Sequence, residues 1–144
     1  MNILIVNGPN LNLLGFREPN IYGNQTLLDI ELWLNNQPES SKHKIVWFQS
    51  NHEGYIIERL HDTIDKTDGI IINPGALTHY SYAIRDAISS INIPVVEVHL
   101  SDIKKREDFR KTSVISDVCI GYFYGFGKLG YLKALKLLAK GQST

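Results

Sequence analysis

The chain has 144 residues, and its 15 basic and 15 acidic side chains give a formal net charge of zero. This balance provides no positive field for nucleic acid or for an anionic membrane surface, so we expect neither partner. Hydrophobic residues make up 43% of the chain, which is typical of a globular protein, and the length predicts one domain over residues 1–144.

The start of the chain, MNILIVNG, has neither a positively charged lead nor a cleavage pattern, so it does not resemble a secretory signal. No apolar run approaches the roughly 20 residues that a membrane helix requires. We therefore expect a cytoplasmic protein. The single cysteine, Cys119, lies in the apolar run VCIGYF, where no neighbour would lower its pKa, and we interpret it as a buried strand residue rather than a nucleophile.

Short runs rich in valine and isoleucine recur along the chain and predict strands. Several are apolar at nearly every position, which is typical of strands that are covered on both faces. These runs are Asn2–Asn7, Lys44–Ser50, Gly69–Asn73, Ile93–Leu100 and Val118–Phe123.

Segments with helical spacing lie between the predicted strands. Thr26 and Asp29 form a capping-box pattern with Asp in place of Glu, ahead of a helix that carries Leu27, Ile30 and Leu34 on one face. Further helices are predicted over Glu53–Lys66, Tyr82–Ser90 and Leu129–Leu138. Regular alternation of strand and helix predicts an α/β three-layer sandwich, with a five-stranded parallel sheet in the flavodoxin-like order 2-1-3-4-5.

Sites in such folds lie beyond the carboxyl ends of the strands, and polar side chains gather there in this sequence. Asn10, Arg17 and Tyr22 follow the first strand, and Asn73 and His79 follow the third. The fourth strand ends in Glu97, His99, Leu100 and Ser101, with Arg106 and Arg110 a little further on. We therefore expect these residues to surround one pocket.

Several common kinds of site are excluded by their missing motifs. The chain has no nucleophile elbow and no Walker loop. The stretch Gly125–Gly130 fits the letters of a dinucleotide fingerprint, but it follows the last strand, so we interpret it as packing at a helix entry. His52-Glu53 begins a zinc motif whose second histidine is replaced by Ile56. We expect neither a metal nor a cofactor.

The arginines, histidines, amides and hydroxyls at this edge would suit a pocket that binds a polyhydroxylated carboxylate. The chemistry available to these side chains is proton transfer. A free tyrosine is a poor base at neutral pH, but a guanidinium within ~4–6 Å favours the phenolate, and Arg17 shares a loop with Tyr22. His99 could act as an acid. Glu97 lies two residues earlier, on the same face of the strand, where its carboxylate can orient the ring and favour its protonated form.

Structural roles for the same residues remain open at this point. A loop tyrosine commonly packs on the surface, an arginine beside it is commonly solvated, and Glu97 could be a strand-end carboxylate that only satisfies hydrogen bonds. His52, at a predicted helix start, fits a structural role better. His79 and His99 follow strands at the predicted edge, and this position favours a functional role for them.

Five ordered blocks of the sequence resemble the signature of the type II 3-dehydroquinate dehydratases, and together they cover essentially the whole chain. The blocks are NGPNLNLLGFREPNIYG, QSNHEG, NPGALTHYSYAIRDA, EVHLSDIKKREDFRKTS and GFGKLGYLKAL. The resemblance implies cofactor-free dehydration of 3-dehydroquinate to 3-dehydroshikimate, a step of the shikimate pathway, by anti elimination through an enolate. Tyr80 and Tyr82 differ from the smaller residues of the family pattern, which puts the pocket wall or a subunit contact there in question.

The resemblance also implies roles for single residues. Tyr22 would be the base with Arg17 lowering its pKa, His99 the acid with Glu97 supporting it, and Asn10 would hold a water that stabilises the enolate. Substrate-binding roles would fall to Asn73, His79, the backbone at Leu100, Ser101 and Arg110, with Arg106 as a possible further contact. Asp86 would come from a neighbouring subunit of a dodecamer built from trimers.

A different class of protein provides the competing hypothesis, namely a flavodoxin-like ligand-binding or signalling module without catalysis. Phospho-acceptor domains require acidic residues at the ends of the first and third strands, where this chain has Asn7 and Asn73. The sequence therefore favours the enzyme.

Overall fold

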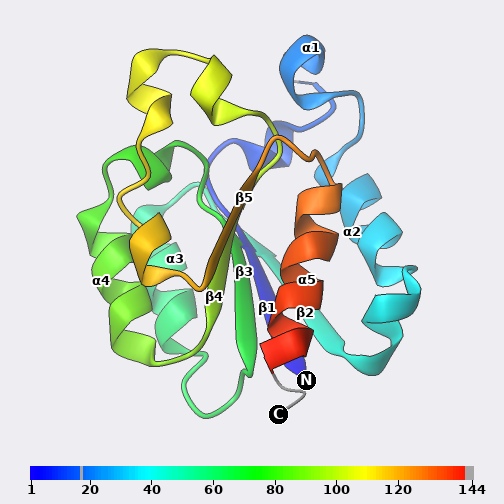
Figure 1. Cartoon of the computed structure of the whole chain (residues 1–144), viewed down its shortest axis with the longest axis vertical. Helices are drawn as coiled ribbons and strands as arrows, with labels where there is room; N and C mark the ends of the chain where they lie inside the picture. The colour runs from blue at the N-terminus through cyan, green and yellow to red at the C-terminus, as the bar shows by residue number, and fades with distance from the viewer. Residues whose placement is uncertain (17, 142–144) are drawn as a thin grey trace.

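A computed structural model describes residues 1–16 and 18–141, with the exception of the Tyr22 side chain. Its centre is a five-stranded sheet in the order β2-β1-β3-β4-β5, with every neighbouring pair parallel (Figure 1). The strands are β1 (Asn2–Asn7), β2 (Lys44–Gln49), β3 (Gly69–Asn73), β4 (Val95–His99) and β5 (Gly121–Tyr124). The predicted flavodoxin-like topology is confirmed.

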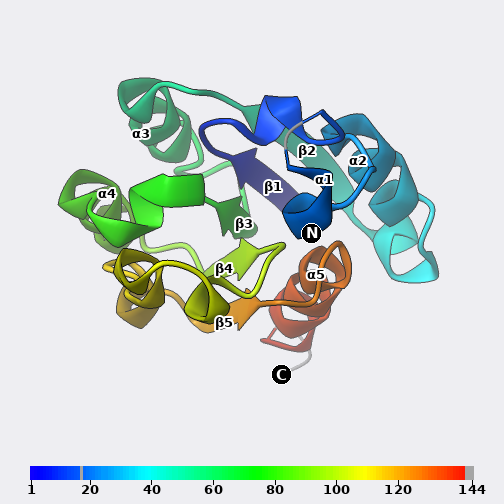
Figure 2. The same ribbon diagram turned by 90° about the horizontal axis from the view of Figure 1, so that it is seen from above.

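Helices cover both faces of the sheet and give the fold its three layers. They are α2 (Leu27–Asn35), α3 (Glu53–His61), α4 (Tyr82–Ile91) and α5 (Leu129–Gly141), while the short helix α1 (Pro19–Tyr22) lies beyond the end of the sheet (Figure 1). Figure 2 shows α3 and α4 on one face, and α2 and α5 on the other. Because side chains alternate along a strand, Ile3 and Ile5 pack toward α2 and α5, while Leu4 and Val6 pack toward α3 and α4. In the described part of the chain, no helix is long and apolar enough to cross a membrane.

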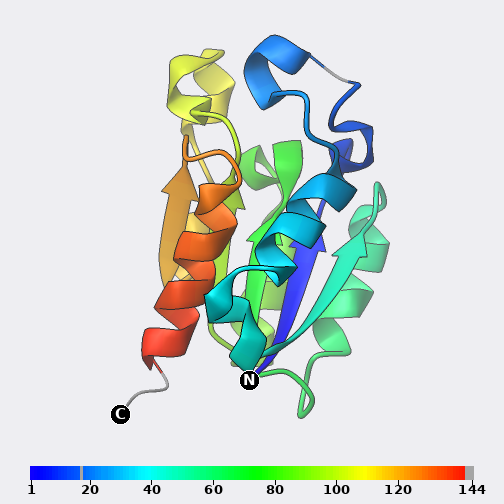
Figure 3. The same ribbon diagram turned by 90° about the vertical axis from the view of Figure 1, so that its right-hand side faces the viewer.

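Short 3-10 helices occupy many of the connections. They are η1 (Leu11–Leu13), η2 (Pro38–Lys42), η3 (Gly75–His79), η4 (Ile103–Lys105), η5 (Asp108–Lys111) and η6 (Ser116–Val118). Of these, η1 follows the carboxyl end of β1, η3 follows that of β3, and η4 and η5 come first in the connection that leaves β4. Figures 1 and 3 show these connections at the same end of the molecule as α1.

Several predicted boundaries are wrong, and two of them lie at places where the chain turns. The last strand begins at Gly121 and not at Val118, because Val118 closes η6 and packs with Cys119 against the α3 and α4 side of the core. Cys119 is therefore a partly buried loop residue, and burial raises the pKa of its thiol to about 12. The helix predicted over Glu53–Lys66 ends at His61, and Asp65 then adopts a left-handed φ of 61°.

The predicted capping box at the start of α2 is confirmed. The Asp29 backbone N–H donates to Thr26 Oγ1 over 3.1 Å, and the Thr26 N–H donates to Asp29 Oδ2 over 2.9 Å. These bonds satisfy two of the N–H groups that a helix start leaves without partners. They fix the end of the long connection that begins at Gly8.

The connections after β1 and β3 are in direct contact at Gly8. Its N–H donates to the carbonyl oxygen of Asn73 over 2.7 Å. A Cβ atom on Gly8 would lie 2.5 Å from the carbonyl oxygen of Pro74, which is closer than real Cβ contacts come. Glycine is therefore required at this position so that the two connections can approach each other.

We predict that Gly8→Ala destabilises the fold by about 1–3 kcal/mol, because the added methyl group must displace backbone rather than a flexible side chain. Urea denaturation measures the change. Gly54→Ala is the matched control, since no atom lies within 4 Å of a Cβ atom there and alanine is favoured in a helix. Equal stability of the two variants would contradict the close-approach argument.

Candidate active site

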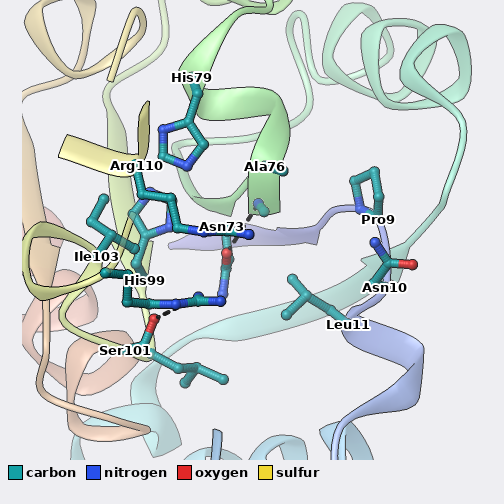
Figure 4. Close-up of a pocket in the computed structure, with 13 residues that line it drawn as sticks. Pro9, Asn10, Leu11, Asn73, Ala76, His79, His99, Ser101, Ile103 and Arg110 are labelled. Carbon is teal, nitrogen blue, oxygen red and sulfur yellow. Dashed lines mark hydrogen bonds between the residues drawn. The ribbon is translucent and has the colours of Figure 1, made fainter. Parts of the chain in front are cut away.

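One pocket opens at the carboxyl ends of β1, β3 and β4, where the sequence predicted a site (Figure 4). The predicted residues that line it are Asn10, Asn73, His79, His99, Leu100, Ser101, Arg106 and Arg110. The structure therefore brings together eight of the expected residues from separate connections, in addition to Glu97 behind His99.

His99 and Glu97 form a buried pair at the wall of the pocket. His99 Nε2 lies 2.6 Å from Glu97 Oε1, and the two side chains are 6% and 0% exposed. Both residues lie on β4, two positions apart, so the geometry follows directly from the period of the strand. The rings of His99 and Tyr122 pack edge to face, with their centroids 6.0 Å apart. This packing and the carboxylate hold the imidazole in one orientation.

His79 is held by a backbone carbonyl. Its Nδ1 donates to the Thr112 carbonyl oxygen over 2.8 Å, and Phe109 packs edge-on against the ring with centroids 5.6 Å apart. Burial lowers the pKa of His79 below the ordinary 6.5, and the nearby His99 and Arg110 lower it further, although the Thr112 bond and Glu97 act in the opposite sense. A neutral ring that donates from Nδ1 leaves Nε2 as an acceptor for a ligand hydroxyl.

Two arginines supply the positive charge of the pocket. Arg110 Nε donates to Glu107 Oε2 over 2.5 Å, and this bond lowers the pKa of the Glu107 carboxyl. The Arg110 guanidinium also stacks over Phe109, 4.7 Å from the ring centroid. Arg106 Nη1 lies 3.5 Å from Ser101 Oγ. Guanidinium groups in this setting are suited to bind a carboxylate.

A buried tyrosine ties together the ends of β1 and β3 beneath the pocket. The Tyr131 hydroxyl donates to Asn7 Oδ1 and accepts from Asn73 Nδ2 over 3.3 Å. Asn73 Oδ1 in turn accepts the Gly75 N–H over 3.2 Å, so one hydrogen of the Asn73 amide remains for a ligand. Burial raises the pKa of Tyr131, which is fully enclosed and stays protonated.

The connection after β1 is held by the connection after β2. Asn10 has a left-handed φ of 70°, and its N–H donates to Asn51 Oδ1 over 2.9 Å. Gln49 Nε2 bonds to the same Asn51 oxygen over 3.1 Å and to the Gly8 carbonyl oxygen over 3.2 Å. The motif QSNHEG, for which no structural role was predicted, thus holds the backbone of Asn10 at the pocket.

The glycine-rich stretch after β5 supports the connection after β4. The Gly125 N–H donates to the Ser101 carbonyl oxygen and the Gly127 N–H to the Leu100 carbonyl oxygen, each over 3.0 Å. Both glycines have positive φ values, 84° and 55°. This stretch, which leads into α5, therefore supports one wall of the pocket.

Several residues of the pocket were not predicted from the sequence. The lining also includes Pro9, Leu11, Gly75, Ala76 and Ile103. Their side chains carry no ionisable group that would have indicated a functional role. Only their position in the motif blocks, close to Asn10, Asn73 and Arg106, could have identified them. Among the described residues, no cluster of three or more His, Cys, Asp or Glu side chains is placed to hold a metal ion.

The structure does not bring every expected residue to the pocket. Asp86 is exposed on α4 and does not belong to the described lining of the pocket. Arg17 lies outside the described residues, and so does the side chain of Tyr22, whose backbone ends α1. The expected Arg17–Tyr22 pair therefore remains a prediction.

Comparison with known proteins identifies the family. The model of the class II dehydroquinases matches residues 1–139. A 3-dehydroquinate dehydratase of Bacillus mycoides (strain KBAB4) is 57% identical over 133 residues, which cover 92% of this chain and 91% of that protein. The crystal structure of the type II dehydroquinase from Butyrivibrio crossotus DSM 2876 superposes with a TM-score of 0.93 at 48% identity, over 96% of this chain and 97% of the other.

The type II dehydroquinase from Propionibacterium acnes is also similar, with a TM-score of 0.91 and 39% identity over 96% of each chain. The protein described here belongs to the class II dehydroquinase family. The family and the enzyme class expected from the motif blocks are confirmed.

We predict that protonation of His79 lowers the free energy of unfolding of the protein as the pH falls. Because its folded-state pKa lies below 6.5, the unfolded chain binds the proton first, and stability is lost as the pH falls from about 6.5 through the folded-state value. Urea denaturation at about pH 7 and about pH 5 should show a smaller loss for His79→Asn, which retains a donor near Thr112, than for the wild type. An equal or larger loss for the variant would contradict this assignment.

Proposed function

We propose that this protein dehydrates 3-dehydroquinate to 3-dehydroshikimate by anti elimination, as a single catalytic domain. The observation that carries the proposal is the buried His99–Glu97 pair on the wall of a pocket that also holds His79, Arg106 and Arg110, in a member of the class II dehydroquinase family. A general acid, a hydroxyl acceptor and a carboxylate-binding end are what dehydration of a polyhydroxylated ring acid needs.

In the proposed first step, the Tyr22 phenolate removes a proton from the carbon next to the ketone, and the electron pair moves to the ketone oxygen to give an enolate. Arg17 favours the phenolate, and Asn10 holds the water that donates to the enolate oxygen. The choice of Tyr22 as the base is supported by the properties of two other tyrosines near the pocket. Burial raises the pKa of Tyr122 and of Tyr131, so neither is available as a base at neutral pH.

In the proposed second step, the enolate collapses and expels the hydroxyl group at the adjacent carbon, which takes a proton from His99 and leaves as water. Glu97 balances the charge of the imidazolium before the transfer. His79 accepts a substrate hydroxyl through Nε2, Asn73 donates to another, and Arg110 with the backbone at Leu100 and Ser101 binds the carboxylate. Arg106 is a further candidate for that carboxylate.

We predict that Tyr22→Phe and His99→Ala each lower kcat by about 10²- to 10⁴-fold, since each removes a proton-transfer group, while circular dichroism shows that both variants still fold. The rise of enone absorbance from 3-dehydroquinate measures turnover. Tyr55→Phe is the control, because Tyr55 is an exposed tyrosine on α3.

A purified wild type that forms no enone would overturn the proposed reaction. The competing reading, a flavodoxin-like binding or signalling module, would then predict a yellow protein with bound flavin or labelling by an acyl phosphate. Against a phospho-acceptor, Asn7 and Asn73 stand at the strand ends and are bonded to Tyr131.

We also propose that the protein assembles into a dodecamer built from trimers, in which Asp86 completes the site of a neighbouring subunit. The exposed position of Asp86 on α4 supports this role. The cytoplasmic location expected from the sequence stays a prediction, which fractionation of the source cell would test.

We predict that Asp86→Asn and His99→Ala are each weakly active alone and that activity returns in part when the two chains are co-expressed, because mixed trimers contain sites with both residues intact. Light scattering measures the mass of the assembly, and the enone assay measures recovery. Activity of the mixture no greater than the sum of the separate variants would contradict the shared site.

A further inference from the structure

The buried carboxylate of Glu97 has more partners than His99. Glu97 is 0% exposed and lies at the centre of a cluster with Thr78 from η3 and Ser113 from the segment after η5. A carboxylate that loses its water must be paired and hydrogen-bonded, otherwise it takes up a proton and becomes neutral. The hydrogens available in this cluster therefore decide its charge.

Counting donors and acceptors fixes the direction of the Ser113 bond. Ser113 Oγ accepts the backbone N–H of Ile115 over 3.2 Å and that of Ser116 over 3.0 Å, and these two bonds fill both lone pairs of the hydroxyl oxygen. The single hydroxyl hydrogen must then be donated. The acceptors within reach are Glu97 Oε2, 2.9 Å away, and Thr78 Oγ1, 2.8 Å away, so Ser113 donates either to the carboxylate or to the hydroxyl that bonds it.

The same count fixes the Thr78 bond. Thr78 Oγ1 lies 2.8 Å from Ser113 Oγ, but that oxygen has no lone pair left to accept with. Thr78 therefore donates its hydroxyl hydrogen to Glu97 Oε1. Thr78 is 0% exposed, and its carbonyl oxygen accepts the Val114 N–H over 2.7 Å, so its backbone is tied to the same segment.

The Thr78 hydroxyl donates to the carboxylate, and Ser113 supports it directly or through Thr78, which leaves Glu97 with an acceptor role only. An ionised Glu97 accepts from His99, so the His99 nitrogen that faces it, Nε2, carries a hydrogen in both the neutral and the charged ring. Among the described residues, none bonds to Nδ1 of His99, which is the nitrogen left for a ligand in the pocket. If Glu97 were neutral, its own hydrogen would occupy the bond and Nδ1 of a neutral ring would carry the hydrogen instead.

We propose that Thr78 and Ser113 are positioning residues that keep Glu97 ionised and thereby hold His99 in the Nε2-protonated form, with Nδ1 as the atom that delivers the proton to the departing hydroxyl. The kinetic part of this inference rests on the proposed dehydration. The part that concerns the imidazole does not, because the protonation of the ring can be observed without substrate.

Thr78→Val is the sharpest variant, since valine has the shape of threonine and lacks only the hydroxyl. We expect kcat to fall on the order of 10-fold or more, with KM within about twofold of the wild type, because the acid is misplaced while substrate binding is retained. Thr78→Ser, which keeps the donor and loses the methyl group, should retain most of the wild-type kcat. Ser113→Ala should lower kcat in the same way as Thr78→Val.

If Thr78 had only a structural role, Thr78→Val and Thr78→Ser would lower kcat equally, or the decrease in kcat would match the decrease in the fraction of folded protein. Circular dichroism at the assay temperature measures that fraction. Either result overturns the proposal. A Thr78→Val enzyme with kcat within about twofold of the wild type overturns it as well, because the donor would then have no effect on the acid.

Nitrogen-15 NMR of histidine-labelled protein tests the ring directly, with His99→Ala used to assign the His99 signals. At a pH where the ring is neutral, the wild type should show a protonated Nε2 and an unprotonated Nδ1, and Thr78→Val should shift signal toward the other tautomer. If the wild type failed to turn over 3-dehydroquinate but gave these spectra, the proposed function would be wrong and the positioning role would stand. A wild type with a protonated Nδ1 would overturn the positioning role whatever its activity.

Discussion

The burial of the Glu97 carboxylate at the end of β4 is the constraint on which the candidate site depends. Taking Glu97 out of water is costly, and the cost is offset only because η3, the segment after η5 and β4 itself each bring a donor to the cluster around it. These donors come from connections that leave different strands. This carboxylate therefore holds together the parts of the chain that surround the pocket, and His99 is the member of the group that lines it.

The rest of the pocket depends on neutral partners at a similar depth. Tyr131 joins the two amides at the ends of β1 and β3, and Asn51 holds the backbone of Asn10. The positively charged side chains that line the pocket lie in the connection after β4, Arg106 just after η4 and Arg110 on η5. Neutral hydrogen bonds therefore form the base of the pocket, and this connection supplies its positive charge.

The sequence was sufficient to predict the sheet and its order because β1, β3 and β4 are short apolar runs buried on both faces, and such runs differ clearly from the amphipathic segments between them. The period of two along β4 also predicted the contact between Glu97 and His99. Boundaries were less accurate. Val118 and Cys119 are apolar in the same way as the strand that follows, and only the packing against α4 reveals that they belong to a turn.

The partners of Glu97 could not be predicted in this way. Thr78 and Ser113 lie 19 and 16 residues from it, and hydroxyl side chains of this kind are common on any surface. Their role depends on which hydrogens and lone pairs remain after the backbone bonds have formed, and that count requires coordinates. Asp86 presents the opposite case, because the family pattern indicates a role that a single copy of the chain does not display.

The bond between Tyr131 and Asn7 spans 124 residues, and it has a consequence for synthesis on the ribosome. The inner strand β1 is made first, but the hydroxyl that bonds to the amide oxygen of Asn7 at its end arrives with the last helix. Until then the end of the strand has to remain hydrated, because an amide buried without that partner is costly. The nascent chain can thus pair its early strands while the base of the pocket stays open, and the binding site closes only as translation of the final helix is completed.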